Sequence, residues 1–359
     1  MSITIETSDY NVLIGENAIF EIKKYIDSHT YSKIFILVDE NIRIHCLPIL
    51  LLHLKNIDDY HVIQIQSGEE HKTIMTCSYV WEKLSELGAD RKSLLVNLGG
   101  GVIGDMGGFI ASTFKRGIDF INIPTTLLAQ VDASVGGKLG IDLNNLKNQV
   151  GLFANPKAVF IFPGFLNTLP LRQLLSGYAE IIKHALIADP DYWQEIQNKD
   201  LFDEKNYFYL ISNSIKIKNE IVKIDPQEKG IRKSLNFGHT IGHALETFSM
   251  MADKSPLFHG EAVAAGIICE SYLSSKFTGL SQKELKEISD FISAKFNYYQ
   301  IENDNVSKII NLMNHDKKNE NQNINFTFIN RIGSVIINQN CLEKDILEAF
   351  DFYRKIYQK

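Results

Sequence analysis

The sequence has few cysteines, no long apolar run and no excess of basic residues. Its four cysteines include no Cys-x-x-Cys pair, so neither a disulfide framework nor a thiolate metal site is expected. No apolar run reaches the roughly 18 residues that a membrane-spanning helix needs. The N-terminal segment has neither a basic nor an apolar region, so we predict no secretory signal and a cytoplasmic protein.

Charge and length narrow the class of protein further. With 37 basic against 43 acidic residues, the formal net charge is −6. A mildly acidic chain without basic clusters is not expected to bind nucleic acid or an anionic membrane. The 359 residues, 45% of them hydrophobic, match a globular protein of about two domains.

Two kinds of pattern follow each other along the chain. β-branched runs at 34–38, 61–65, 94–98 and 120–123 alternate with helical spacing, as in 75–87, which indicates a mostly parallel, Rossmann-like sheet. After about residue 169 helical patterns dominate, with one late hairpin and a terminal helix. The helices are expected at 176–188, 206–223, 233–248, 260–276 and 282–297, and the hairpin at 323–329 and 334–338. We therefore predict an α/β domain over 1–165 and a mainly helical, metal-binding domain over 166–359.

A glycine-rich loop over 98–105 follows a predicted strand and begins a predicted helix. Such a loop lets backbone N–H groups approach a pyrophosphate, although a tight structural turn uses glycine too. Gly99, Gly101 and Gly104 satisfy G-x-G-x-x-G, with Asp119 at the spacing of a ribose-binding acid. Asp39 is the better ribose candidate, because it closes its strand whereas Asp119 begins one.

A second segment combines cations with glycine. Arg116-Gly117, the stretch 123–138 and Lys147-Asn148 place charged side chains among apolar residues. Buried charges need partners or a function, so this segment favours a phosphorylated, anionic substrate. Each lysine taken alone is better explained as a solvated surface residue, but together with Gly136-Gly137 the lysines favour a site.

A third cluster offers candidate zinc ligands in the helical half: Glu180, His239, His243, Glu246 and His259. His239 and His243 are four residues apart and share one helix face, so spacing alone predicts that both bind the metal. The alternative is that these histidines are ordinary structural or surface residues.

Taken in order, these motifs resemble the 3-dehydroquinate synthase family over nearly the whole chain. The segments that carry the resemblance are 99–105, Phe109, 116–117, 124–128, 132–138, 147–148, 168–170, Glu180, 235–240, 243–246, 259–263 and 316–318. The resemblance implies a two-domain, homodimeric enzyme of the shikimate pathway, which uses NAD and a divalent metal, zinc or cobalt. It also implies a fold like that of the glycerol and iron-dependent alcohol dehydrogenases.

The resemblance assigns roles residue by residue. The implied metal ligands are Glu180, His239 and His259, while His243 becomes an active-site residue that is not a ligand. The implied NAD contacts are Asp39, Glu69, Lys72, Gly101, Val102, Ile103, Gly104, Asp105, Thr125, Thr126, Asp132, Lys138, Lys147, Phe165 and Thr168. The implied substrate and catalytic contacts are Arg116, Lys138, Asn148, Lys183, Lys218, Arg232, Asn236, His243 and Lys317, with Lys318 as an alternative to Lys317. His184 departs from the family pattern, and we keep it as an outer residue of the metal site because it adds an imidazole near Glu180.

The implied reaction converts 3-deoxy-D-arabino-heptulosonate 7-phosphate to 3-dehydroquinate and phosphate. It combines transient oxidation by NAD, β-elimination, reduction and an intramolecular aldol closure. Three alternatives remain open: another sugar-phosphate cyclase, an NAD-dependent polyol dehydrogenase of the same fold, and a catalytically inactive NAD-binding protein.

Overall fold

The computed structural model describes residues 1–55, 60–143, 146–314 and 324–358. It divides into two compact units, which we call unit 1 (Met1–Pro170 with Glu204–Asn219) and unit 2 (Leu171–Asp203 with Glu220–Lys359). Unit 1 is an α/β unit and unit 2 is mainly helical, so the predicted fold class is confirmed. Within the described ranges, no helix has the length and apolar character to cross a membrane.

Unit 1 is built on a seven-stranded sheet with the order β1-β2-β9-β6-β5-β3-β4. β1 and β2 pair antiparallel, and the remaining pairs are parallel. The four strands predicted from β-branched runs are confirmed as β3, β4, β5 and β6, because such runs suit a sheet covered on both faces. The strands are β1 Ser2–Glu6, β2 Asn11–Gly15, β3 Ile34–Asp39, β4 Tyr60–Ile65, β5 Leu94–Gly99, β6 Asp119–Pro124 and β9 Ala158–Ile161.

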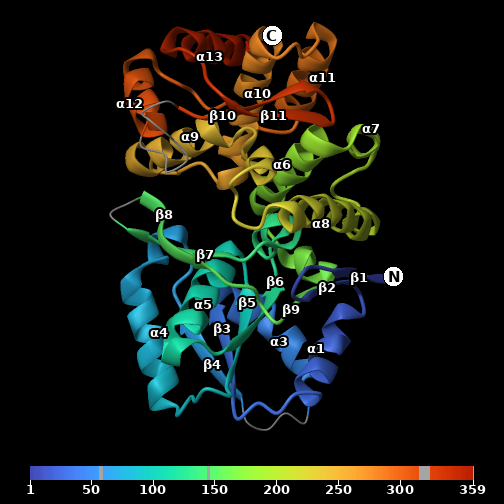
Figure 1. The fold of residues 1–359 in the computed structure, drawn as a ribbon, viewed down its shortest axis with the longest axis vertical. Helices are drawn as coiled ribbons and strands as arrows, with labels where there is room; N and C mark the ends of the chain where they lie inside the picture. Colours follow the sequence, from blue (N-terminus) through green and yellow to red (C-terminus); the bar gives the residue numbers. More distant parts are fainter. Residues whose placement is uncertain (56–59, 144–145, 315–323, 359) are drawn as a thin grey trace. The chain divides into compact units, whose positions relative to one another are not determined.

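Helices cover both faces of this sheet (Figure 1). Alternate residues of β3 point to opposite faces: Phe35 and Leu37 pack with α4 and α5, whereas Ile36 and Val38 pack with α1 and α3. Each face therefore has its own apolar core. The helices are α1 Ala18–Asp27, α2 Glu40–His45, α3 Leu47–His53, α4 Ile74–Glu86 and α5 Gly101–Thr113.

A separate antiparallel hairpin, β7 Lys138–Leu143 with β8 Leu146–Phe153, packs beside α5. This hairpin was not predicted from the sequence, because its Lys, Asn and Gly residues are of types depleted in strands. Short helical turns complete the unit at η1 Glu69–His71, η2 Phe114–Arg116, η3 Ala129–Ala133, η4 Pro163–Thr168 and η5 Glu204–Asn206.

Unit 2 packs its helices around a small hairpin, β10 Phe326–Arg331 with β11 Ser334–Gln339. The predicted helix over 233–248 is wrong at its start: residues Ile231–Asn236 form the 3-10 turn η6, and α9 begins at His239. Gly238 breaks the helix between them, because its φ of 78° is left-handed. The helices are α6 Leu171–Ala188, α7 Pro190–Asn198, α9 His239–Ala252, α10 His259–Phe277, α11 Gln282–Ser293, α12 Asn303–Asn314 and α13 Glu343–Tyr357; α8, Tyr207–Ile224, contributes to both units.

Candidate active site

Three helices of unit 2 bring together the predicted metal ligands. Glu180 lies in the middle of α6, while His239 and His259 are the first residues of α9 and α10. Glu180 is fully buried, and its Oε1 lies 3.3 Å from His239 Nε2 and 3.3 Å from His259 Nε2. The two imidazoles thus converge on one carboxylate oxygen from separate helices.

The spacing of these atoms fits a tetrahedral metal ion. With metal–ligand bonds of about 2.0–2.1 Å, two neighbouring ligand atoms in a tetrahedron lie about 3.3 Å apart. The Nδ1 atoms of both rings face acceptors, Phe237 O at 3.1 Å for His239 and Glu246 Oε2 at 3.2 Å for His259. Because those acceptors hold the Nδ1 protons, both Nε2 atoms are directed inward as donors to a metal. Two histidines and a carboxylate are a donor set that zinc accepts while keeping an open position.

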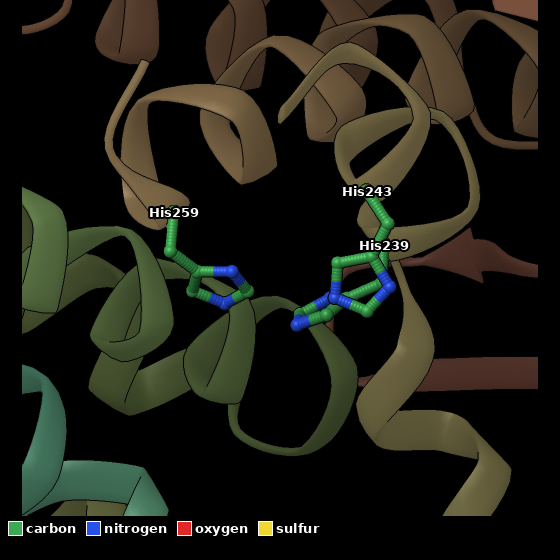
Figure 2. Close-up of side chains that lie close together, drawn as sticks. All are labelled: His239, His243 and His259. Atoms are coloured by element: carbon green, nitrogen blue, oxygen red, sulfur yellow. The ribbon is translucent and has the colours of Figure 1, made fainter. Parts of the chain in front are cut away.

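His243 lies in the same cluster, one turn after His239 on α9. Nitrogens of His239, His243 and His259 lie within 4.8 Å of one another. Figure 2 shows the three rings directed toward a common space, with His239 and His243 on one side and His259 opposite. The ion-pair distances to Glu180 involve His239 and His259. All three imidazoles are thus close enough to act on a metal or a molecule bound there.

Close helix contacts explain how the ligands meet. Gly260 follows His259, and a Cβ there would lie 1.9 Å from Ser176 O on α6. The Gly260 N–H also donates to Ser176 Oγ at 3.0 Å, one turn before Glu180. At the other contact, a Cβ on Gly266 would lie 1.9 Å from Gly238 O. Glycine at these positions lets α10 approach both α6 and the start of α9.

A buried carboxylate from α10 completes the N-terminus of α9. Gly238 has no side chain with which to cap the helix, and Glu270 supplies the missing acceptor. Glu270 is fully buried and accepts N–H groups from Gly238 at 2.7 Å and Ile241 at 3.1 Å. Glu270 was not predicted from the sequence, although a glutamate directly after the apolar run Ile267-Ile268-Cys269 was a signal for a buried role.

Burial and neighbouring charges shift the pKa values of all three predicted ligands. Burial acts to raise the pKa of Glu180, but Lys183 and His239 hold it well below its usual range. Burial lowers the pKa of His239 to about 4, against the pull of Glu180. Burial also opposes protonation of His259, but Glu246 and Glu180 raise its pKa to about 9.

The other predicted residues of unit 2 lie either beside Glu180 or in the polar loop before α9. Lys183 is buried and pairs with Glu180 Oε2. The Asp225 carboxylate accepts backbone N–H groups of Lys229, Gly230 and Arg232, and the buried Arg232 donates to Pro226 O at 2.6 Å. Asn236 donates to Glu228 Oε1 at 3.0 Å. A ring nitrogen of His184 lies within 4.8 Å of a Glu180 oxygen. Lys317 and Lys318 lie outside the described residues.

In unit 1 the glycine-rich loop begins α5 as the sequence predicted. Gly100 precedes the helix, and a small cavity is lined by the loop and by residues of β5, β6 and η3. Apart from the backbone of its own helix, a Cβ added to Gly104 would have no heavy atom of the described residues within 4 Å, so there is space beside this residue. A Cβ on Gly100 would lie 3.0 Å from the Thr126 side chain. This helix N-terminus has no side-chain cap, and the N–H groups of a first helical turn suit a phosphate. Thr125 is buried beside the loop and donates its N–H to Gly99 O.

A buried lysine joins several of the predicted NAD and substrate residues. Lys72 is 3% exposed; its Nζ lies 2.7 Å from Asp105 Oδ2 and 2.8 Å from Asn148 Oδ1. Burial alone would lower the pKa of Lys72, but Asp105 and Glu69 raise it. Lys147 and Glu69 form an adjacent ion pair at 3.5 Å. Residues from η1, α5 and β8 thus form one network.

The remaining predicted residues of unit 1 lie in different surroundings. Lys218 on α8 binds Asp132 in the π-helical turn η3, with Nζ 2.9 Å from Oδ1 and 2.7 Å from the backbone oxygen. Asp39 caps α2 through Ile42 N at 2.8 Å. Phe165 is buried in the core and accepts a bond from Thr168 through its backbone oxygen. Lys138 is exposed at the start of β7.

Arg116 is separate from this network. It is exposed, has a φ of 70°, and lines a surface pocket together with Asp90, Arg91 and Lys115. No other predicted site residue lines that pocket among the described residues.

Comparison with a solved structure defines the class first. The chain has the fold of a 2-deoxy-scyllo-inosose synthase crystallised with carbaglucose-6-phosphate, NAD+ and Co2+, with a TM-score of 0.86, 25% identity and 99% of both chains covered. The chain thus shares its two-domain fold with an NAD- and metal-binding synthase.

Sequence comparison then gives the family. The family models for the 3-dehydroquinate synthase N-terminal and C-terminal parts match residues 62–176 and 177–319. A 3-dehydroquinate synthase of Parabacteroides distasonis is 44% identical over 98% of this chain and 99% of its own length. One of Campylobacter concisus is 38% identical over 96% of both. The chain belongs to the 3-dehydroquinate synthase family of enzymes, and these matches do not favour the alternatives.

Proposed function

We propose that this chain converts 3-deoxy-D-arabino-heptulosonate 7-phosphate to 3-dehydroquinate and inorganic phosphate, as a carbon–oxygen lyase of the shikimate pathway. The observation that carries the proposal is the convergence of His239 Nε2 and His259 Nε2 on one oxygen of the buried Glu180. A divalent-metal site of this kind, in a chain 44% identical to a 3-dehydroquinate synthase, supports the metal-assisted chemistry of that family.

Glu180, His239 and His259 would hold a divalent metal, and we propose zinc, with cobalt as a substitute. The residues that would hold NAD are those that the family resemblance assigns, including the loop Gly101–Asp105, Thr125 and Thr126, Lys72 and Asp39. When bound, the metal polarises substrate hydroxyl groups, while NAD accepts a hydride and returns it, so that none is consumed. The solved cyclase with NAD+ and Co2+ supports this pair of cofactors.

His243 is the residue that we propose moves the hydroxyl proton. Its ring centroid lies 5.0 Å from that of His239 and 5.6 Å from that of His259, so the imidazole is next to the ligands. An imidazole can exchange a proton near neutral pH, as transient oxidation of an alcohol requires. The substrate phosphate can act as the base in the elimination.

Cationic and amide side chains would hold the anionic groups of the substrate through charge-assisted hydrogen bonds. We assign this role to Arg116, Lys138, Asn148, Lys183, Lys218, Arg232 and Asn236, and to Lys317 or Lys318. The buried pairs of Lys183 with Glu180 and of Lys218 with Asp132 support it, because cations that are already desolvated bind a phosphate or carboxylate strongly.

We further propose that residues 1–165 act as the NAD-binding domain and 166–359 as the metal- and substrate-binding domain. Family resemblance supports a cytoplasmic homodimer.

A phosphate-release assay tests the proposed function. Purified protein with NAD, Zn2+ and the heptulosonate phosphate should release inorganic phosphate, with no net NADH measured at 340 nm as the absorbance of the reduced nicotinamide. Omission of the heptulosonate phosphate is the control. Steady NADH production without phosphate release would contradict the proposal and indicate a polyol dehydrogenase. Turnover of glucose 6-phosphate instead would indicate another cyclase.

A further inference from the structure

A second buried carboxylate touches the metal site from outside the ligand set. Glu246 lies on α9 and is 3% exposed, and its Oε2 lies 3.2 Å from Nδ1 of His259. On the opposite side of the same ring, Nε2 lies 3.3 Å from Glu180 Oε1. The imidazole of His259 is thus held between two carboxylates that come from different helices, α6 and α9.

The two contacts have different consequences for the ring. An ionised carboxylate only accepts hydrogen bonds, so Glu246 keeps a proton on Nδ1 and leaves the Nε2 lone pair for a metal. In His239 a backbone carbonyl has this role, because Nδ1 faces the oxygen of Phe237 at 3.1 Å and Nε2 is again left for a metal. A carbonyl fixes the ring of one histidine, whereas a full negative charge fixes the ring of the other.

Burial alone does not distinguish Glu246 from other acidic residues. Glu270 is also buried, but its partners are the backbone N–H groups of Gly238 and Ile241. Burying a carboxylate costs free energy unless it is hydrogen-bonded. Glu246 places that charge on the ring of a ligand, where it increases the electron density available at Nε2.

We infer that Glu246 is a positioning residue of the metal site, which orients His259 and strengthens it as a donor without itself binding the metal. This inference rests on the proposed ligand set Glu180, His239 and His259. Its contact with Nδ1 puts the Glu246 carboxylate on the side of the ring away from Glu180. Carboxylates that act through a ligating histidine typically change metal affinity by about 10–100-fold when they are removed.

Two substitutions of Glu246 separate its hydrogen bond from its charge. E246A removes both, and the zinc dissociation constant should rise by about 10–100-fold. E246Q keeps an amide oxygen that accepts the Nδ1 proton but removes the charge, so its zinc affinity should lie between those of the wild type and E246A. The affinities are measured on metal-free protein by competition with a chromophoric chelator. The visible spectrum of the Co2+-loaded protein, which reports the ligand field, should change in E246A and be largely restored in E246Q.

The matched control is E287Q. Glu287 accepts a ring N–H from Trp193 at 2.7 Å in the same unit, so the substitution removes the same charge from an equivalent bond at a residue that is not a ligand. E287Q should leave zinc affinity and the Co2+ spectrum unchanged. If E246A and E246Q bind zinc as tightly as the wild type, with an unchanged spectrum, the inference is overturned. E180A tests the ligand set itself. If E180A retains zinc, the proposed metal site is wrong. If E180A loses zinc while E246A binds it with unchanged affinity, only the role of Glu246 is rejected.

Discussion

In unit 1 the predicted site residues form separate pairs of one cation and one anion, whereas in unit 2 two imidazoles and the ammonium of Lys183 all meet one buried carboxylate, Glu180. Lys72 binds Asp105, Lys147 faces Glu69, and Lys218 binds Asp132. In unit 2, by contrast, two imidazole nitrogens face the same oxygen of Glu180.

The difference indicates how each unit is prepared for its ligand. The Nε2 atoms of His239 and His259 converge on Glu180, and their Nδ1 atoms already have hydrogen-bond partners. Such side chains can bind a metal without rearrangement, so the site is preorganised. Paired charges must instead exchange partners when an anionic molecule binds, but until then the pairs stabilise the unit. We therefore expect substitutions in the metal cluster of unit 2 to affect metal binding and rate, and substitutions in the Lys72 network of unit 1 to affect stability.

The largest effects are expected from the two histidines of α9. His239→Ala should lose the metal and reduce kcat/KM by about 1,000-fold or more, because the polarisation of the substrate hydroxyls contributes several kcal/mol. His243→Ala should keep the metal and lose about 100- to 10,000-fold in kcat, which is the range for a lost proton-transfer group. Metal content by atomic absorption and steady-state phosphate release measure the two separately.

Because the substitutions lie one turn apart on one helix, each is the control for the other. Metal loss from His243→Ala with metal retained by His239→Ala would reverse the ligand assignment. Circular dichroism of both variants checks that α9 and the rest of the protein remain folded.

The buried lysine of unit 1, Lys72, is expected to contribute to the stability of that unit. Lys72→Met leaves the Asp105 carboxylate without the ammonium that lies 2.7 Å away, and removing one partner of a buried pair costs about 3 kcal/mol in the free energy of unfolding. Urea unfolding followed by circular dichroism measures the loss. Metal content should not change.

Lys83→Met is the matched control, because it breaks an exposed ion pair with Glu86 on α4, and little change in stability is expected. If Lys72→Met is no more destabilising than Lys83→Met, the buried network does not stabilise unit 1. The proposed difference between the two units would then be wrong for unit 1.

These contacts also show what sequence alone could predict. β-branched runs located β3, β4, β5 and β6, because a sheet covered on both faces requires continuous apolar strands. The start of α9 was placed too early, because η6 has helical spacing and only the left-handed Gly238 ends it. Spacing favoured His239 and His243 equally as ligands. Glu180 is far from both in sequence, so its role came from the family resemblance, and its contact with His239 and His259 depends on how the helices pack.

The smallest effect is expected at Asp225, which organises the polar loop of unit 2 that contains Arg232. Burial acts to raise its pKa, but bonds from the N–H groups of Gly230, Lys229 and Arg232 hold the pKa of Asp225 below its usual range. Because these bonds favour the charged form, their contribution is complete above the unfolded-state pKa of about 3.9 and is lost as pH falls through the lower folded-state value. Asp225→Asn should therefore reduce the free energy of unfolding by about 1 kcal/mol at pH 7, and the difference from the wild type should be smaller at pH 2 than at pH 7. Urea unfolding at both pH values measures it, with the exposed Asp191→Asn as the control. If the difference at pH 2 is as large as at pH 7, the charge of Asp225 does not stabilise the loop. The packing of its side chain would then account for the effect, and the position of Arg232 would not depend on a charged carboxylate.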